Sequence, residues 1–366
     1  MTRAFLSVLY RLFPRPQRRQ RMPAFCVVEM RNSQTPQHIT LMPPANHDLN
    51  QAARARKDEF YTQLSDIEKE LRYYRPFFYE KTVLCNCDDP RVSNFFKYFT
   101  LNFEALGLKR VIATCYKSNT PNLFSNNEVD KAVYQIYEGD KNGNRRVDPE
   151  EIDVLPLHGD GDFRSDECKE LLKQADIVCT NPPFSLFREY IAQLVTFNKK
   201  FLIIGNINAI TYKEVFPLIV SNKLWLGSSI HSGDRKFNVP DDYPLNAAGC
   251  GIDEEGRKFI RVKGVRWFTN LDYKERHEEL PLYKHYTSEE YPKYDNYDAI
   301  NVKKVSEIPL DYDGVMGVPI TFLDKYCPEQ FEIVGLDRYV EDNPRYGHRF
   351  TIKGKETYAR ILIRRK

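Results

Sequence analysis

The residues with the clearest chemical capacity are Asn181, Pro182, Pro183 and Phe184, which follow the apolar run 175–180. The Asn181 side-chain oxygen and the Pro182 carbonyl can each accept one N–H of an exocyclic amine, which localises the nitrogen lone pair. Two successive prolines fix φ and hold both acceptors still. Phe184 offers an aromatic face for stacking. The pattern indicates group transfer to an amino nitrogen, and its alternative is an ordinary turn after a strand.

The flanking sequence predicts that this motif lies at the edge of an open sheet. Residues 175–180 are apolar and rich in strand formers, 185–195 have apolar residues at helical spacing, and 201–206 form a second buried-strand pattern. In open α/β sheets, ligands bind at the carboxyl ends of the strands. We therefore expect an α/β fold with helices on both faces of the sheet and the motif at this edge.

A similar unit of strand, turn, helix and strand precedes the motif, over 81–86, 87–90, 95–103 and 110–116. A turn in this position is where a nucleoside-bearing cofactor binds. The candidate cofactor residues are Asn86, Asp88, Asp89 and Pro90. Each aspartate serves equally well as a turn residue or a helix N-cap. The turn contains no glycine, unlike the Gly-rich turns of most related sheets.

Two further loops carry polar residues near the predicted edge. Asp160, Asp162 and Phe163 precede the strand of the motif, at a position that resembles the one where related sheets place a cofactor-binding acidic residue. The resemblance implies that Asp160 or Asp162 binds the cofactor and that Phe163 stacks on its ring. The alternative is a loop that caps the following helix. Asn206 and Asn208 follow the strand 201–206 and are candidates for lining the substrate pocket, or for a polar turn that satisfies its own backbone.

Composition limits the function classes. The chain has 366 residues, 42% of them hydrophobic, which is enough for one large or two unequal domains. The formal charge of +3 excludes a global polyanion footprint, so any nucleic-acid contact must be local. Eight cysteines without CxxC spacing indicate reduced thiols in the cytoplasm, with neither a disulfide framework nor a metal site.

Several segments together carry a family resemblance: VLCNCDDPRVSNFFKYF, HGDGDFRS, DIVCTNPPFSLFREY, FLIIGNINAIT and GVPITFLDKYCPEQFEIVG. In this order they resemble the EcoRI-type adenine-specific DNA methyltransferase family, from roughly residue 53 to the C-terminus. The resemblance implies a Rossmann-like sheet that transfers a methyl group from S-adenosylmethionine to adenine N6, with the base flipped out of duplex DNA. It also implies that the glycine-free cofactor turn is shared by the family.

Alternatives stay open at this point. The same chemistry serves RNA or a protein amide, and a catalytically silent DNA-binding homologue would keep the fold. Double-stranded DNA is the expected partner, and a cognate restriction endonuclease acting on the same site is a further candidate. We expect a monomer without a membrane span.

The resemblance and the composition together suggest four regions. Residues 1–49 form a basic, Pro-containing extension, with Met22 or Met30 as alternative starts to Met1; 50–220 form the catalytic core; 221–307 form a mixed, β-rich target-recognition region; and 308–366 complete the core. Basic and aromatic residues alternate in the third region, as a DNA-facing element requires. The candidates there for substrate contact are Lys223, Arg235 and Lys236.

Three local expectations complete the analysis. Apolar spacing predicts a helix over 50–74, ended by Arg75-Pro76. The Asn142-Gly143 pair predicts a hairpin between 133–137 and 145–147. The tail 358–365 alternates like an edge strand.

Overall fold

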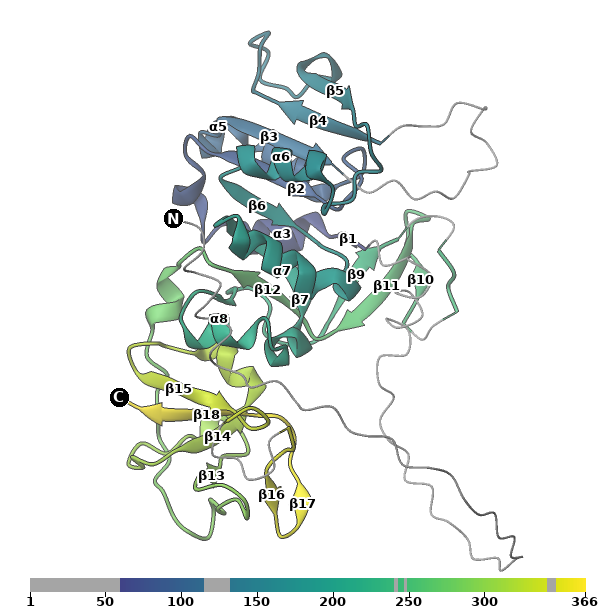
Figure 1. Ribbon diagram of the computed structural model, residues 1–366. Coiled ribbons are helices and arrows are strands. Elements are labelled where there is room, and N and C mark those ends of the chain that lie inside the picture. Colours follow the sequence, from purple (N-terminus) through teal and green to yellow (C-terminus); the bar gives the residue numbers. More distant parts are fainter. Residues whose placement is uncertain (1–59, 115–131, 240–242, 247–248, 341–346) are drawn as a thin grey trace, which may run out of the picture. The chain divides into compact units, whose positions relative to one another are not determined.

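The computed structural model describes residues 60–114, 132–239, 243–246, 249–340 and 347–366 (Figure 1). All of them belong to one compact unit, 46–366. The predicted extension 1–49 and its alternative starts lie outside the described residues, as do residues 50–59 of the predicted helix. Among the described residues, no helix is both long and apolar enough to cross a membrane.

The largest sheet has eight strands in the order β5-β4-β3-β2-β6-β7-β12-β8 (Figure 1). Their bounds are β2 Thr82–Asn86, β3 Arg110–Thr114, β4 Val133–Tyr137, β5 Ile152–Pro156, β6 Ile177–Thr180, β7 Lys200–Asn206, β8 Trp225–Leu226 and β12 Val265–Thr269. The inner strands β3, β2, β6 and β7 are parallel, and the flanking pairs are antiparallel. The chain adds β3 on one side of β2 and β6 on the other, so the strand order reverses at the β2–β6 junction.

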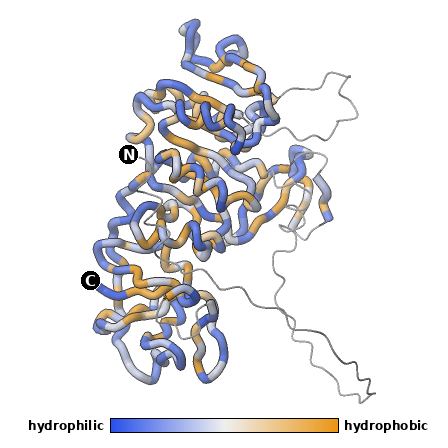
Figure 2. Tube along the Cα trace, viewed as in Figure 1, coloured by the Kyte–Doolittle hydropathy of each residue, from blue (hydrophilic) through white to orange (hydrophobic). Residues whose placement is uncertain are grey.

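Helices pack against both faces of this sheet. The bounds are α3 Leu64–Leu71, α4 Asn94–Leu101, α5 Phe103–Leu106, α6 Asp166–Gln174, α7 Phe187–Thr196 and α8 Phe216–Val220. Apolar residues of α3 and α4 share one core with Val83 and Cys85. Residues of α6 and α7 share the other core with Leu84. Hydrophobic residues follow the central strands, since both faces are buried (Figure 2).

A second sheet of four antiparallel strands lies beside the first, in the order β1-β9-β11-β10. The strands are β1 Tyr61–Thr62, β9 Asp234–Asn238, β10 Gly251–Ile252 and β11 Lys258–Lys263. The predicted region 221–307 therefore divides, because β8 and β12 belong to the large sheet. Of its other strands, β9, β10 and β11 join β1 from the N-terminal part of the core, and residues 300–301 belong to the C-terminal sheet.

The C-terminal strands form a sheet of their own, in the order β13-β14-β18-β15. They are β13 Ile300–Asn301, β14 Met316–Pro319, β15 Phe331–Leu336 and β18 Arg360–Arg365, and a hairpin of β16 Thr351–Ile352 and β17 Lys355–Glu356 lies between β15 and β18 in the chain. Apolar residues of β14, β15 and β18 belong to the same core as α6 and α7. The predicted tail strand is present as β18, but it is an inner strand paired on both sides instead of an edge strand.

Two other local predictions need correction. Among the described residues of the predicted helix, only Leu64–Leu71 form an α-helix, and Tyr61 and Thr62 instead pair with β9. The hairpin partner of β4 is β5, so the expected strand at 145–147 is part of the connecting loop. The short 3-10 helices are η1 Arg75–Phe78, η2 Pro149–Glu151, η3 Phe184–Leu186, η4 Ile207–Thr211, η5 Lys274–His277, η6 Val305–Glu307 and η7 Ile320–Lys325.

Candidate active site

The motif that opened the sequence analysis lies at the carboxyl edge of the large sheet, where the strand order reverses. β6 ends at Thr180 and β2 ends at Asn86, and the Thr180 hydroxyl donates a hydrogen bond to the Asn86 carbonyl. Asn181 is the next residue and is 6% exposed. The motif therefore directly follows a strand, β6, whose residues are all buried, as the sequence predicted.

The Asn181 side chain is fixed by one contact and leaves its acceptor free. Its Nδ2 donates to the Phe60 carbonyl at 2.5 Å. Its Oδ1 is buried and has no hydrogen-bond partner. Because only Nδ2 can donate, the hydrogen bond to the Phe60 carbonyl fixes the orientation of the Asn181 side-chain amide. A buried acceptor without a partner is costly, and this one is available to an N–H of a substrate.

Phe184 lies in the same turn and contacts Phe60. The two ring centroids are 5.9 Å apart with the planes at 82°, an edge-to-face contact. Phe184 begins η3 after Pro183 and is half-buried. Phe60 also contacts Phe237 of β9, with centroids 6.0 Å apart, so one ring links the motif to the second sheet. Pro182 is buried beside Asn181.

The first predicted cofactor turn is strongly held by its own contacts. The Oδ1 of Asn86 accepts a hydrogen bond from the Tyr190 hydroxyl. Asp88 is 4% exposed, and the Ser93 hydroxyl donates to its Oδ2 at 3.3 Å. Asp89 accepts from the Arg91 backbone at 3.0 Å and pairs with the Arg91 guanidinium at 2.6 Å, which is the turn role weighed against cofactor contact.

The lack of glycine in this turn has a conformational consequence. Cys87, directly after β2, has φ of 78°, in the left-handed region that favours glycine. Burial and the neighbouring Asp88 carboxylate raise the pKa of the Cys87 thiol well above its usual range. The thiol is therefore protonated at neutral pH and packs as an apolar group. Pro90, two residues beyond Asp88, is buried.

The loop with Asp160, Asp162 and Phe163 reaches the same edge through Tyr190. The Phe163 ring packs on Tyr190, with centroids 5.0 Å apart, and is 6% exposed. Asp160 accepts a hydrogen bond from the Asp162 backbone at 3.0 Å, and Asp162 pairs with Arg164 at 2.6 Å. Tyr190 thus contacts both segments, Phe163 through its ring and Asn86 through its hydroxyl.

Other buried polar atoms at this edge also have no hydrogen-bond partner. They are the hydroxyl of Thr62 in β1 and that of Thr114 at the end of β3. Thr114 ends β3 and Asn181 follows β6, so two of the three atoms lie at the carboxyl ends of parallel strands, and Thr62 is two residues from Phe60, which Asn181 contacts. Such atoms cost free energy unless a ligand or water satisfies them. These atoms therefore fit a polar ligand near the strand ends.

The candidate substrate residues fall into three places. Asn206 ends β7, where its Oδ1 accepts from the Asn208 backbone at 3.0 Å, so it makes the polar turn considered as the alternative. Arg235 and Lys236 lie in β9 of the second sheet, which pairs with β1 next to Phe60. Lys223 precedes β8, whose Trp225 pairs with Thr269, opposite the start of β7. The structure does not bring Lys223 to the edge that carries Asn181.

Comparison with known proteins was made on the whole chain. The family described as "Adenine-specific methyltransferase EcoRI" matches residues 48–366. The chain belongs to this family of adenine-specific DNA methyltransferases. It is 52% identical over 323 residues to the type II methyltransferase M.EcoRI of Escherichia coli, covering 88% of this chain and 97% of that protein.

Two mycoplasma proteins are also similar. The type II methyltransferase M.MgeORF184P of Mycoplasma genitalium is 37% identical over 337 residues, covering 87% of this chain and 99% of the relative. M.MpnI of Mycoplasma pneumoniae is 37% identical over 340 residues, covering 87% and 98%. No solved structure matches the chain significantly. The expected family is confirmed, and the chain is an adenine-specific methyltransferase.

For a methyltransferase of this family, the structure adds residues that the sequence analysis missed. Phe60 contacts Asn181 at the edge that carries the motif, and the Asn94 amide donates to the carbonyl of the nearby Thr62 at 2.7 Å. Tyr190 contacts both loops that were predicted to bind the cofactor. The strand-forming triplet Phe60-Tyr61-Thr62 was the available signal, but helical spacing placed Phe60 in a helix instead.

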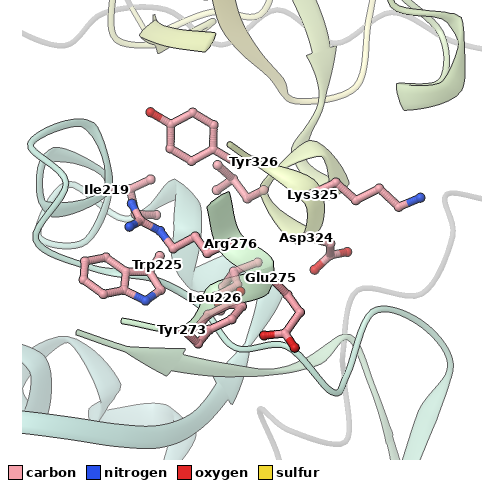
Figure 3. Close-up of a pocket in the computed structure, with 10 residues that line it drawn as sticks. Ile219, Trp225, Leu226, Tyr273, Glu275, Arg276, Asp324, Lys325 and Tyr326 are labelled. Atoms are coloured by element: carbon pink, nitrogen blue, oxygen red, sulfur yellow. Dashed lines mark hydrogen bonds between the residues drawn. The ribbon is translucent and has the colours of Figure 1, made fainter. Parts of the chain in front are cut away.

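A small cavity in the described part of the chain lies away from this site. It is about 30 Å³, room for about two water molecules, and lies where β8, η5 and η7 meet. Arg276 lies over the Trp225 ring, with 4.0 Å from its guanidinium carbon to the ring centroid (Figure 3). Trp225 lies near the level at which β7 begins, whereas Asn181 lies at the carboxyl ends of the parallel strands. The cavity is therefore part of the packing between the sheets.

Proposed function

We propose that this enzyme transfers a methyl group from S-adenosylmethionine to N6 of an adenine flipped out of duplex DNA, on a Rossmann-like sheet. The observation that carries the proposal is the buried, unpartnered Oδ1 of Asn181, whose orientation is fixed by the Phe60 carbonyl. The family match supports adenine over the RNA, protein-amide and silent alternatives. The proposal includes action as a cytoplasmic monomer, with a cognate restriction endonuclease acting on the same site.

Asn181 acts on the amine nitrogen. Its Oδ1 accepts one N–H of the adenine amino group, and the Pro182 carbonyl accepts the other. Both bonds draw the nitrogen toward tetrahedral geometry and localise its lone pair. They strengthen as positive charge develops on the nitrogen, so they favour the transition state over the bound substrate. The amine loses its proton after transfer, and no general base is required.

Phe184 positions the base. One edge of its ring rests against Phe60, which is itself 2% exposed and cannot move aside. A flipped adenine can stack on the ring, which repays part of the unstacking energy. The same Phe60 contacts Phe237 of β9, so the base platform and the second sheet share one support.

The residues at the strand ends fit S-adenosylmethionine. The hydroxyls of Thr62 and Thr114 are buried hydrogen-bonding groups without partners, and the Asp88 carboxylate is buried in the turn after β2. These groups would hold the polar parts of the cofactor, and Asp160 or Asp162 its adenine amino group. When bound, the cofactor supplies an electrophilic methyl group. Asn181 would present the amine to it across the β2–β6 junction.

The second sheet is the proposed target-recognition element. Arg235 and Lys236 lie in β9, and Arg261 and Lys263 lie in β11 beside it. Lys236 pairs with Asp253 at 3.1 Å, whereas Arg235 Nε is buried without a partner. Cations on adjacent strands suit a β-ribbon that contacts phosphates and base edges. β9 is also one strand pair away from Phe60, which connects recognition to the catalytic turn.

The test measures methyl transfer from radiolabelled S-adenosylmethionine to duplex DNA, to RNA and to protein. The wild-type chain should methylate only duplex DNA, at adenine in one short sequence. Asn181→Ala should lower kcat by about 100- to 1,000-fold, as loss of a comparable oriented group does, while cofactor affinity is retained. Phe184→Ala should reduce the rate as well.

Matched controls are available on exposed surfaces. Asn142→Ala removes an exposed asparagine from the β4–β5 loop, and Phe77→Ala removes a phenylalanine that is 37% exposed in η1. Both should methylate like the wild type. Full activity in Asn181→Ala would overturn the assigned mechanism. Cofactor binding with methylation of RNA or protein but not DNA would overturn the substrate.

A further inference from the structure

We propose that Arg188, Lys213, Arg338 and Arg349 form a track that binds backbone phosphates of duplex DNA, extending from the catalytic turn to the C-terminal sheet. The inference rests on the proposed function, because it assumes a DNA substrate. It adds a contact surface outside the second sheet, on residues that the sequence analysis did not select.

The track begins beside the catalytic turn. Arg188 is in the first turn of α7, which follows η3 and Phe184 directly. Its guanidinium carbon lies 4.1 Å from the centroid of the Tyr212 ring. The nearest carboxylate, Glu214, is 3.9 Å from Arg188 Nε, a long contact between half-exposed groups that is weak in water. The Arg188 charge is therefore held in place by an aromatic ring and is largely uncompensated.

The next step crosses to the C-terminal sheet. Lys213 is exposed in the segment after η4, which begins at the carboxyl end of β7. Its Nζ lies 5.6 Å from the centroid of the Tyr339 ring. Tyr339 follows β15 and is the neighbour of Arg338 in the chain. Two contacts between a cation and a ring thus connect the catalytic edge to the end of β15.

Arg338 and Arg349 form a crowded pair at that end. The Gly347 backbone donates to the Arg338 carbonyl at 2.8 Å, which holds the two segments together. Arg349 Nη1 is 3.9 Å from a carboxylate oxygen of Asp337, too far for a hydrogen bond. Neither this Nη1 nor Arg338 Nε has a hydrogen-bond partner, although both atoms are buried.

The charges near this pair leave an excess of positive charge. Burial lowers the pKa of Arg349, and so do the positive charges of Arg338 and Arg360. Asp337 is fully buried, and burial raises its pKa to about 6, so it is mostly ionised at neutral pH. Asp337 and Glu356 raise the pKa of Arg349, so two carboxylates stand against three guanidinium groups. An anion with several oxygens would relieve this repulsion. A phosphodiester does so well, because guanidinium groups bind phosphate through two parallel hydrogen bonds.

The experiment is a salt titration of affinity for a duplex that carries the methylated sequence in its centre. The variants are Arg188→Gln with Lys213→Gln, and Arg338→Gln with Arg349→Gln. Each lost phosphate contact should reduce the slope of log K against log salt by about 0.9, so each pair should reduce it by about 2. Affinity at fixed low salt should fall about tenfold or more, for cognate and unrelated duplexes alike, because phosphates carry no sequence information.

The control is Arg364→Gln with Arg365→Gln. These residues lie in β18 opposite Phe331 and Glu332, at the other end of the same sheet, and Arg364 is 3.4 Å from the Glu332 carboxylate. The DNA affinity of this variant should depend on salt concentration as that of the wild type does. Arg349→Lys, which keeps the charge, should retain most of the slope and so separates charge from folding. Arg188 and Lys213 are exposed enough that their variant should fold normally.

The outcomes separate this inference from the proposed function. If the wild type methylates duplex DNA and both variant pairs keep its salt slope, the track is wrong and the proposed function stands. If the control pair lowers the slope as much as the track pairs, the effect is general charge and the track is also wrong. A wild type that fails to methylate duplex DNA would instead remove the proposed function.

Discussion

Two buried polar groups of the large sheet, Arg266 and Asn181, differ in how completely they are satisfied. Arg266 of β12 pairs with Asp324 of η7 at 2.7 and 2.9 Å and also donates to the carbonyls of Val265 and His231. Asn181 has one donor bonded, to Phe60, and its acceptor unbonded. Both side chains are almost completely buried. The difference separates a group that joins two sheets from the group that is proposed to bind the substrate amine.

The comparison indicates where the fold tolerates an energetic cost. An unpartnered buried acceptor costs about 1–3 kcal/mol, so it persists only where something else is gained. At the edge that carries Asn181, the proposed gain is a preorganised acceptor for an amine. Between the large sheet and the C-terminal sheet, each of the three side-chain nitrogens of Arg266 donates at least one hydrogen bond. Mutation of Arg266 should therefore reduce stability, whereas mutation of Asn181 should reduce activity.

The largest expected effect is on stability, at Arg266. Arg266→Met leaves the Asp324 carboxylate buried without its partner, which should reduce the free energy of unfolding by about 3–5 kcal/mol. Denaturant unfolding measures the loss. The Arg364→Gln variant breaks an exposed pair on the same neighbouring sheet and should change stability by less than about 1 kcal/mol. If Arg266→Met and Arg364→Gln lost equal free energy of unfolding, the buried pair of Arg266 and Asp324 would contribute no more to stability than the exposed pair at Arg364.

The complementary prediction concerns the stability of Asn181→Ala. This variant loses one hydrogen bond to Phe60 but also removes the unpartnered oxygen, so its free energy of unfolding should stay within about 1 kcal/mol of the wild type. Its catalytic loss should be far larger in relative terms. Thermal or denaturant unfolding of the purified variant checks this. A destabilisation as large as that of Arg266→Met would mean that Asn181 is a structural group.

The sequence predicted one of these sites and not the other, for a physical reason. Asn181 stands in a compact motif after a buried strand, so residue type and local pattern were sufficient. Arg266 and Asp324 are 58 positions apart, and neither has a local signal for pairing. Phe60 likewise reaches Asn181 across 121 positions. Strands buried on both faces, such as β2 and β6, were predictable because their apolar runs are continuous.

Partner choice between strands was the less predictable part of the fold. The Asn142-Gly143 signal suggested a short hairpin, but the partner of β4 is β5, beyond a loop in which Asp140 binds the backbone of Gly143 and Arg145. The tail strand was expected from its alternation, but not its inner place in a separate sheet. Pairing depends on tertiary contacts that periodicity does not encode.

A smaller effect should reveal strain at the cofactor turn. Cys87 has φ of 78°, which costs a residue with a side chain about 1–2 kcal/mol but costs glycine little. Cys87→Gly should therefore be more stable than Cys87→Ala by about 1 kcal/mol, the reverse of the usual order in regular structure. Both variants lose the thiol, so their difference isolates the backbone. Unfolding measurements that find Ala the more stable would exclude strain at this turn.

The smallest expected effect is a pH dependence where the large sheet meets the C-terminal sheet. His277 contacts Asp272 and Glu329, each at 2.9 Å, and these hydrogen bonds raise its pKa above the usual 6.5. The raised pKa means that the histidinium stabilises the fold fully below pH 6.5, and that this stabilisation is lost as the pH rises through the folded-state pKa. His277→Ala should thus cost more at pH 6 than at pH 9.

The magnitude should be about 0.5 kcal/mol or less, because the His277 side chain is 37% exposed and the pair is screened by water. Stability of the wild type and of His277→Ala, measured across this pH range, gives the difference directly. His285→Ala is the matched control, since His285 contacts one carboxylate, Asp311, and is 71% exposed. A cost of His277→Ala that is constant with pH would show that the two sheets are joined there by packing and by Arg266 alone.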